Sequence, residues 1–179
     1  MLQNATARPP RCTLVNLSTG EEKACLFNPE ALAERVQMNF ARGEVFGMSH
    51  QPQQYTSTTN RGLPGLQFYL DKIYAREIEP DADIMDFRHF LMAFSAPPAA
   101  AADVAHNAPP RLLFVWPGVL SVQTVVLSLE FRYTDFGTDG SVLRYTAAVE
   151  LEEARDTRQT SEDLRAGTVV ELGVIDLTV

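Results

Sequence analysis

Clustered acidic side chains are the first candidates for chemistry in this chain. Asp81, Asp83 and Asp86 follow one another closely, and carboxylates gathered in this way are ligands that hard cations prefer. The same residues stand at the predicted start of a helix, where carboxylates cap free backbone N–H groups and face the positive end of the helix dipole. We therefore interpret these three aspartates as capping residues and predict no metal site.

Histidines and cysteines are the next candidates, and their spacing predicts neither a catalytic nor a metal centre. His50, His89 and His106 lie far apart, with no cysteine or acid at metal-ligand spacing. Cys12 and Cys25 are too few for a disulfide framework. They could face each other across a hairpin, but we expect free thiols. The chain has no phosphate-binding glycine loop, nucleophile elbow or paired-histidine motif, so we predict no enzymatic activity and no cofactor.

Acidic and aromatic residues near two strand ends complete the candidates. Glu150, Glu152 and Glu153 close a predicted strand. We interpret them as a solvated face, and the alternative is a charged wall against a partner or along a channel. A pair of acids for glycoside hydrolysis stays open, although nothing fixes two carboxyl groups at the required separation. Trp116 ends an apolar strand, and we expect a buried rim residue rather than a ligand-stacking platform.

The composition indicates one acidic globular domain. The chain has 179 residues, of which 45% are hydrophobic and 21% charged, with a net charge of −8. This length suits one domain that folds without disulfides or metal, and the negative charge argues against nucleic-acid binding. Residues 1–11 lack the apolar core of a secretory signal, and no apolar run reaches the length of a membrane span. We therefore expect cytoplasmic synthesis and assembly, without direct membrane insertion.

Alternation of apolar and polar residues predicts a chain made mostly of strands. The expected strands cover residues 11–17, 22–27, 36–40, 65–74, 111–116, 119–133, 142–153 and 169–179. A polar excursion covers residues 43–63 and includes a short strand near 54–58. Strands with one apolar face are typical of a β-sandwich or barrel.

Two segments carry helix signals. Asn28 is a good N-cap and Pro29 suits the first helical position, so a short helical turn is expected there. Apolar residues then recur at helical spacing over about residues 82–95. We predict that this helix packs on the β core through Phe87, Phe90, Leu91 and Phe94.

The order of five short segments resembles a known family. The segments are residues 12–21 (CTLVNLSTGE), 26–32 (LFNPEAL), 46–55 (FGMSHQP and a Gln-Tyr pair), 66–71 (LQFYLD) and 108–118 (APPRLLFVWPG). In this order they resemble the N-terminal tube-like domain of contractile injection system proteins, over residues 11–153. The resemblance implies a β-rich α+β fold, a tube-protein-like sandwich or barrel of two packed sheets with one flanking α-helix, and no enzymatic activity.

The resemblance also implies a division of the chain. Residues 1–10 form a flexible N-terminus, residues 11–153 the tube-like domain, and residues 154–179 a C-terminal extension with a strand. Many relatives carry a LysM module after the tube-like domain. Residues 154–179 are too short for a complete LysM module and lack its Gly-Asp-Thr-Leu opening, so a role that depends on LysM is not expected here.

The implied role is that of a structural baseplate hub or tube-initiator adaptor, which joins the spike to the inner tube as a ring subunit. The implied partners are further copies of this chain in a hexamer, the spike protein, inner-tube initiator proteins and baseplate wedge proteins. They belong to a phage tail-like particle that is either released or membrane-anchored. Two alternatives stay open: a main inner-tube subunit, and a monomeric small-ligand-binding β-barrel.

Two segments are the expected contact surfaces of such a subunit. The polar excursion is unusual for a compact domain and typical of a contact loop. The β-branched segment at residues 169–179 is apolar on both faces and needs a partner strand. The candidate interface residues are Gly47, Met48, Ser49, His50, Gln51, Pro52, Tyr55, Val170, Leu172 and Val174.

Overall fold

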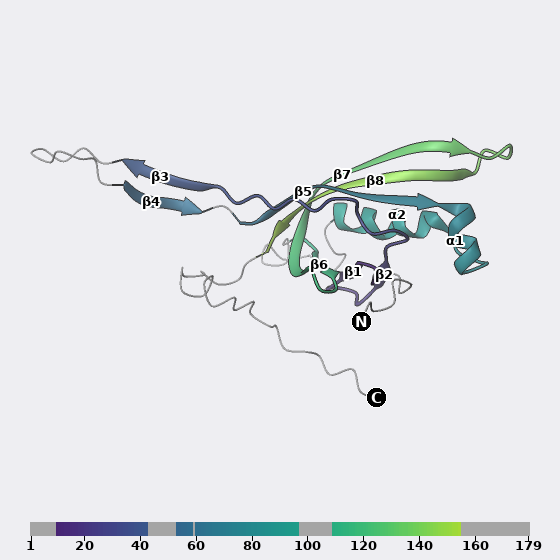
Figure 1. Ribbon diagram of the computed structural model, residues 1–179, viewed down its shortest axis with the longest axis horizontal. Helices are drawn as coiled ribbons and strands as arrows, with labels where there is room; N and C mark the ends of the chain where they lie inside the picture. The colour runs from purple at the N-terminus through teal and green to yellow at the C-terminus, as the bar shows by residue number, and fades with distance from the viewer. Residues whose placement is uncertain (1–9, 43–52, 59, 97–108, 155–179) are drawn as a thin grey trace, which may run out of the picture.

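The body of the protein is a curled, six-stranded antiparallel sheet (Figure 1). The computed structural model describes residues 10–42, 53–58, 60–96 and 109–154. In the order of the sheet, the strands are β2 (Glu22–Ala24), β1 (Thr13–Asn16), β6 (Arg111–Trp116), β7 (Leu120–Phe136), β8 (Val142–Glu153) and β5 (Gly62–Asp71). The expected β-rich α+β fold with a flanking helix is confirmed, and the sheet that builds it runs without a break from β2 to β5.

Strand β7 connects the two halves of this sheet. Along its length, the residues that face the core change from even-numbered to odd-numbered positions. Its first residues pair with β6 and its later residues with β8. The register shifts between Val126 and Ser128, so Leu127 is an extra residue and is 53% exposed. Strict alternation along this strand predicts that Val125, Leu127 and Leu129 share the inner face. This prediction is wrong, because a bulge reverses the alternation of side chains.

Regular alternation holds in the two strands that follow β7 in the sheet. In β8, Tyr145, Ala147, Val149 and Leu151 are buried, as their spacing predicts. In β5 the alternation follows a register shift between Leu63 and Leu66: Leu66, Phe68 and Leu70 are buried, and the two residues between them are exposed. These inward residues form one core cluster with the apolar side chains of the second helix.

Helix α2 (Ile84–Met92) is the amphipathic helix that the spacing predicts, and η1 (Ala93–Ser95) continues it as a 3-10 turn. Asp83 caps α2, its side chain accepting a hydrogen bond from Met85 N at 2.9 Å. Phe87, Phe90, Leu91 and Phe94 are all buried. Phe87 contacts Phe68 of β5 edge-on, and the Tyr145 hydroxyl of β8 donates to Ile84 O at 2.6 Å. The helix therefore packs on β5 and β8 (Figure 1).

Two local expectations are wrong. The strand expected to reach residue 74 ends at Asp71, and α1 (Lys72–Ile78) begins directly after it. No helical turn forms at Asn28. Its side chain instead accepts a hydrogen bond from Cys12 N at 2.8 Å and donates one to Pro10 O at 3.0 Å. The Asn28 side chain, which could cap a helix, is therefore hydrogen-bonded to the backbone of residues 10 and 12 instead.

A second, two-stranded sheet extends away from the body as an arm (Figure 1). It consists of β3 (Met38–Arg42) and β4 (Gln53–Thr58), paired antiparallel from Met38↔Thr58 to Arg42↔Gln53. The short strand expected near residues 54–58 is therefore confirmed. Within the described ranges, no helix has the length and apolar character needed to cross a membrane.

Candidate assembly surface

The arm formed by β3 and β4 is the main candidate for an assembly surface. Its two strands pair with each other, and neither joins the six-stranded sheet. The segment before β3 is fastened to the body by an isolated bridge, in which Arg35 N donates to Gly62 O and Gly62 N donates to Arg35 O, both at 2.8 Å. Beyond this bridge the arm projects outward, away from β5 and β8 (Figure 1).

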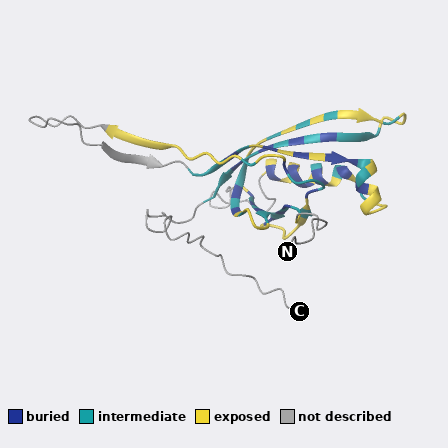
Figure 2. Ribbon diagram, viewed as in Figure 1, coloured by how far each residue is buried: buried dark blue, intermediate teal, exposed yellow. Residues whose placement is uncertain are grey.

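Apolar side chains are exposed along the first strand of the arm and the residues before it. Val36 is 44% exposed, Met38 54% and Phe40 46%, and Figure 2 shows β3 as exposed. Because successive side chains of a strand point to opposite faces, Met38 and Phe40 share one face. A two-stranded hairpin is at best marginally stable alone in water. This combination makes the exposed face of β3 a candidate contact surface.

Ionic and polar contacts hold the root of the arm. Arg61 lies within 3.4 Å of the Glu153 carboxylate and 3.7 Å of Glu34, and Glu153 N donates to Arg61 O at 2.8 Å. Glu152 accepts a hydrogen bond from Asn60 Nδ2 at 3.3 Å. The acids at the end of β8 were expected to form a solvated face, but Glu152 and Glu153 instead fix the segment that leads from the arm into β5.

The predicted interface residues relate to the arm in different ways. Gly47, Met48, Ser49, His50, Gln51 and Pro52 fall in the sequence between β3 and β4, outside the described residues. Tyr55 lies in β4, where its backbone is opposite Phe40. Val170, Leu172 and Val174 also lie outside the described residues. Val36, Met38 and Phe40 are not among the predicted interface residues, although the alternation of apolar and polar residues over 36–40 is a signal that could have indicated them.

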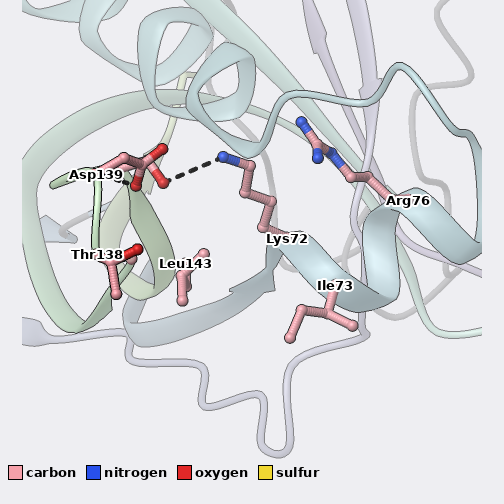
Figure 3. A pocket seen from close by; sticks show the side chains of 8 residues that line it. Lys72, Ile73, Arg76, Thr138, Asp139 and Leu143 are labelled. Carbon is pink, nitrogen blue, oxygen red and sulfur yellow. Dashed lines mark hydrogen bonds between the residues drawn. The ribbon is translucent and has the colours of Figure 1, made fainter.

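A shallow hollow lies between α1 and the turn that joins β7 to β8 (Figure 3). Its volume is about 370 Å³. Its lining residues are Lys72, Ile73, Arg76, Gly137, Thr138, Asp139, Ser141 and Leu143. Lys72 Nζ donates to Ser141 Oγ at 3.4 Å. Asp139 accepts a hydrogen bond from Ser141 N at 3.0 Å, and this bond lowers the pKa of its carboxyl group. The polar groups of the hollow thus hold the turn together, and the hollow is open to solvent rather than an enclosed ligand cavity.

The remaining candidate residues do not converge. His89 is exposed on α2, while His50 and His106 lie outside the described residues. Trp116 is half-buried against the core at the end of β6, as expected for a rim residue. Cys12 and Cys25 are free thiols, as expected, and both are buried. In the part of the chain that the structure describes, no three His, Cys, Asp or Glu side chains gather as a metal site would require.

A family model agrees with the segments that suggested a family. The family described as "Contractile injection system tube protein" matches residues 14–162. No curated protein sequence matches the chain. Among solved structures, a chain of the anti-feeding prophage baseplate, determined by cryo-EM and 6-fold symmetrised, is similar at 8% sequence identity and a TM-score of 0.41. The alignment covers 87% of this chain and 95% of that chain.

Proposed function

Because this chain belongs to the contractile injection system tube protein family, we propose that it is a baseplate hub or tube-initiator adaptor, a ring subunit that joins the spike to the inner tube. In this proposal, residues 11–153 form the tube-like domain and residues 154–179 an extension of it. The ring is a hexamer, and its neighbours are the spike, the inner-tube initiator proteins and the baseplate wedge proteins. The role is structural, without catalysis.

The observation that carries the proposal is the arm. Val36, Met38 and Phe40 remain about half exposed where the hairpin leaves the body, and a two-stranded hairpin is at best marginally stable alone in water. Contact with an adjacent subunit covers these side chains and supplies the missing stabilisation. A ring repeats the same contact around its axis, so one arm per subunit serves every interface.

Substitution on the arm tests this part of the proposal. Met38→Ser with Phe40→Ser removes apolar surface without touching the core, so we expect loss of the ring and an unchanged unfolding midpoint of the subunit. Val119→Ser is the matched control, since Val119 is 57% exposed in the turn between β6 and β7. Native mass spectrometry reports the number of subunits. An arm variant that assembles like the unmodified protein contradicts the proposal.

Copy number separates the adaptor from the main inner-tube subunit. The family is named for the tube protein, so a subunit repeated along the whole tube is the competing role. An adaptor is present as one ring per particle, in fixed ratio to the spike, whereas a tube subunit is present in many rings. Quantitative mass spectrometry of purified particles measures this ratio. A copy number that grows with tube length would overturn the adaptor role.

Residues 168–179 are proposed to add a strand to a sheet edge of a neighbouring ring component. The order of the six-stranded sheet leaves β2 and β5 as its edges, and β5 is the longer of the two. Deletion of residues 168–179 should then impair assembly more than subunit folding. A truncated protein that assembles normally but unfolds at much lower denaturant concentration would show that the segment serves its own subunit.

A further inference from the structure

Two cysteines face each other across the first hairpin of the sheet. Cys12 immediately precedes β1 and Cys25 immediately follows β2, and the register Thr13↔Ala24 places them opposite one another. Cys25 N donates to Cys12 O at 2.9 Å. Opposite residues of an antiparallel pair have Cα atoms about 4.5–5.5 Å apart and side chains on the same face. This spacing lies within the range of about 4.4–6.8 Å over which disulfides form.

The two thiols differ in how readily they lose a proton. A hydrogen bond from the Cys25 side chain lowers the pKa of Cys12, although burial opposes this effect. The same hydrogen bond, together with burial, raises the pKa of Cys25. The thiolate is the nucleophile in cysteine chemistry, and the lowered pKa of Cys12 agrees with Cys12 as the first sulfur to react.

The site is buried but lies next to a short strand at the edge of the sheet. Cys12 and Cys25 are 0% and 1% exposed. Strand β2, however, is the terminal strand of the sheet and has three residues. Its pairing in the sheet is with β1 alone. Local opening of so short an edge strand breaks few hydrogen bonds, so a small solute reaches the thiols without global unfolding.

We propose that Cys12 and Cys25 form a redox-modification site that closes to an intramolecular disulfide in the presence of a small peroxide. The Cys12 thiolate attacks one oxygen of hydrogen peroxide and the O–O bond breaks. The hydroxide that leaves takes up the proton that Cys12 released, so that one water and a Cys12 sulfenic acid result. The Cys25 sulfur then attacks the Cys12 sulfur and displaces a second water. Two thiols are oxidised and one peroxide is reduced. This inference does not depend on the role proposed for the ring.

Closure would fasten the edge of the sheet covalently. The crosslink joins the residue before β1 to the residue after β2, so β2 can no longer separate from β1. It also restrains Asn28, whose side chain binds Cys12 N and Pro10 O. The disulfide thereby restrains the backbone near residues 10–12 and the segment after β2 together.

Peptide mapping of the full-length protein tests the proposal. The folded, reduced protein is treated with hydrogen peroxide in dilute solution, denatured, alkylated with N-ethylmaleimide and digested with trypsin, which separates the two cysteines at Lys23. We expect peptides 12–23 and 24–35 to appear linked, lighter by two hydrogen atoms than their sum, in most of the protein. Dithiothreitol followed by a second round of alkylation should release them as two alkylated peptides.

Single variants identify the order of the steps. In Cys25→Ser, the sulfenic acid at Cys12 should persist and be trapped by dimedone; in Cys12→Ser, Cys25 should stay a thiol at the same peroxide dose. The proposal is overturned if both cysteines of the unmodified protein stay thiols after peroxide treatment and are alkylated, or if disulfides form only between chains. It is also overturned if the linked pair appears only when peroxide is added in denaturant. These readings use the unmodified protein and stand even where a variant fails to fold.

Discussion

Asp71 offers a sharp test of how the body is built, because one side chain joins three elements. It is the last residue of β5 and the N-cap of α1. Its Oδ1 accepts hydrogen bonds from Ile73 N at 2.8 Å and Tyr74 N at 3.1 Å. Its Oδ2 accepts one from Arg144 Nε of β8 at 2.7 Å. Removal of this carboxylate should loosen α1 and its attachment to the sheet together.

The magnitude follows from these contacts. Replacing a capping aspartate by alanine costs about 1–2 kcal/mol when a well-formed cap is lost, so Asp71→Ala should lower the Tm by roughly 2–8 °C for a chain of this size. The pair with Arg144 adds less, because the Arg144 side chain is 40% exposed and water screens its charge. Asp71→Asn keeps an oxygen for Ile73 N and Tyr74 N, so it should lose less than half as much.

The pH dependence provides an independent reading. Burial opposes ionisation of Asp71, but hydrogen bonds from Tyr74 N, Arg144 and Ile73 N outweigh it and lower the pKa of the carboxyl group. A carboxyl whose pKa is lowered by folding stabilises the native state fully above its unfolded pKa, about 3.9, and loses this effect as the pH falls through the folded value. The stability difference between the unmodified protein and Asp71→Asn should therefore be constant from about pH 7 to 5 and shrink below about pH 4.

Urea unfolding followed by circular dichroism measures these differences, with Asp135→Asn as the matched control. Asp135 also pairs with Arg144, at 2.9 Å, but is half-exposed and caps no helix. Its substitution should leave the midpoint within error of the unmodified protein. The reasoning is refuted if Asp71→Ala unfolds like the unmodified protein, if Asp71→Asn is as damaging as Asp71→Ala, or if the difference grows in acid.

Two further substitutions test the core and a turn. Phe90→Ala should cost about 3–5 kcal/mol, because Phe90 is buried and meets Phe94 edge-on at 5.4 Å. Met92→Ala, half-exposed on the same helix, should stay within about 0.5 kcal/mol; equal effects in urea would mean that the apolar stripe does not face the core. Gly140→Ala should cost about 1 kcal/mol through its φ of 79° alone, since an added Cβ meets nothing within 4 Å. A neutral melting curve would show that the turn relaxes.

Periodicity made most of the body predictable from the sequence. In β8, an unbroken alternation predicted which residues are buried, and in α2 the spacing of Phe87, Phe90 and Leu91 predicted the helix and its inner face. These patterns are long enough to distinguish the two-residue repeat of a strand from the 3.6-residue repeat of a helix. Leu127 shows the limit: one extra residue in β7 reverses the faces, and the sequence around it still alternates.

The other departures depend on partners that are remote in the sequence. Asn28 can cap a helix or bind backbone elsewhere, and the nearby positions of Cys12 N and Pro10 O decided between them. Val36, Met38 and Phe40 alternate like a core strand, so the sequence predicts a strand but not its location. These residues lie on an arm outside the six-stranded sheet because β3 pairs with β4 rather than with β5.

The pairing of the sheet has a consequence for the order in which the protein folds during synthesis. β1 pairs with β6, and β5 pairs with β8, through partners such as Leu14↔Phe114 and Leu63↔Leu151. On the ribosome, the first half of the chain emerges before either partner exists. Hydrogen-bonded pairing with so large a sequence separation is slow to form. Strand β1 stays without its partner until β6 is released, and β5 stays without its partner until β8 is released. Until then, nascent chains translated on one message risk premature association. Completion of β8 is thus the event that separates the folding of a subunit from its assembly.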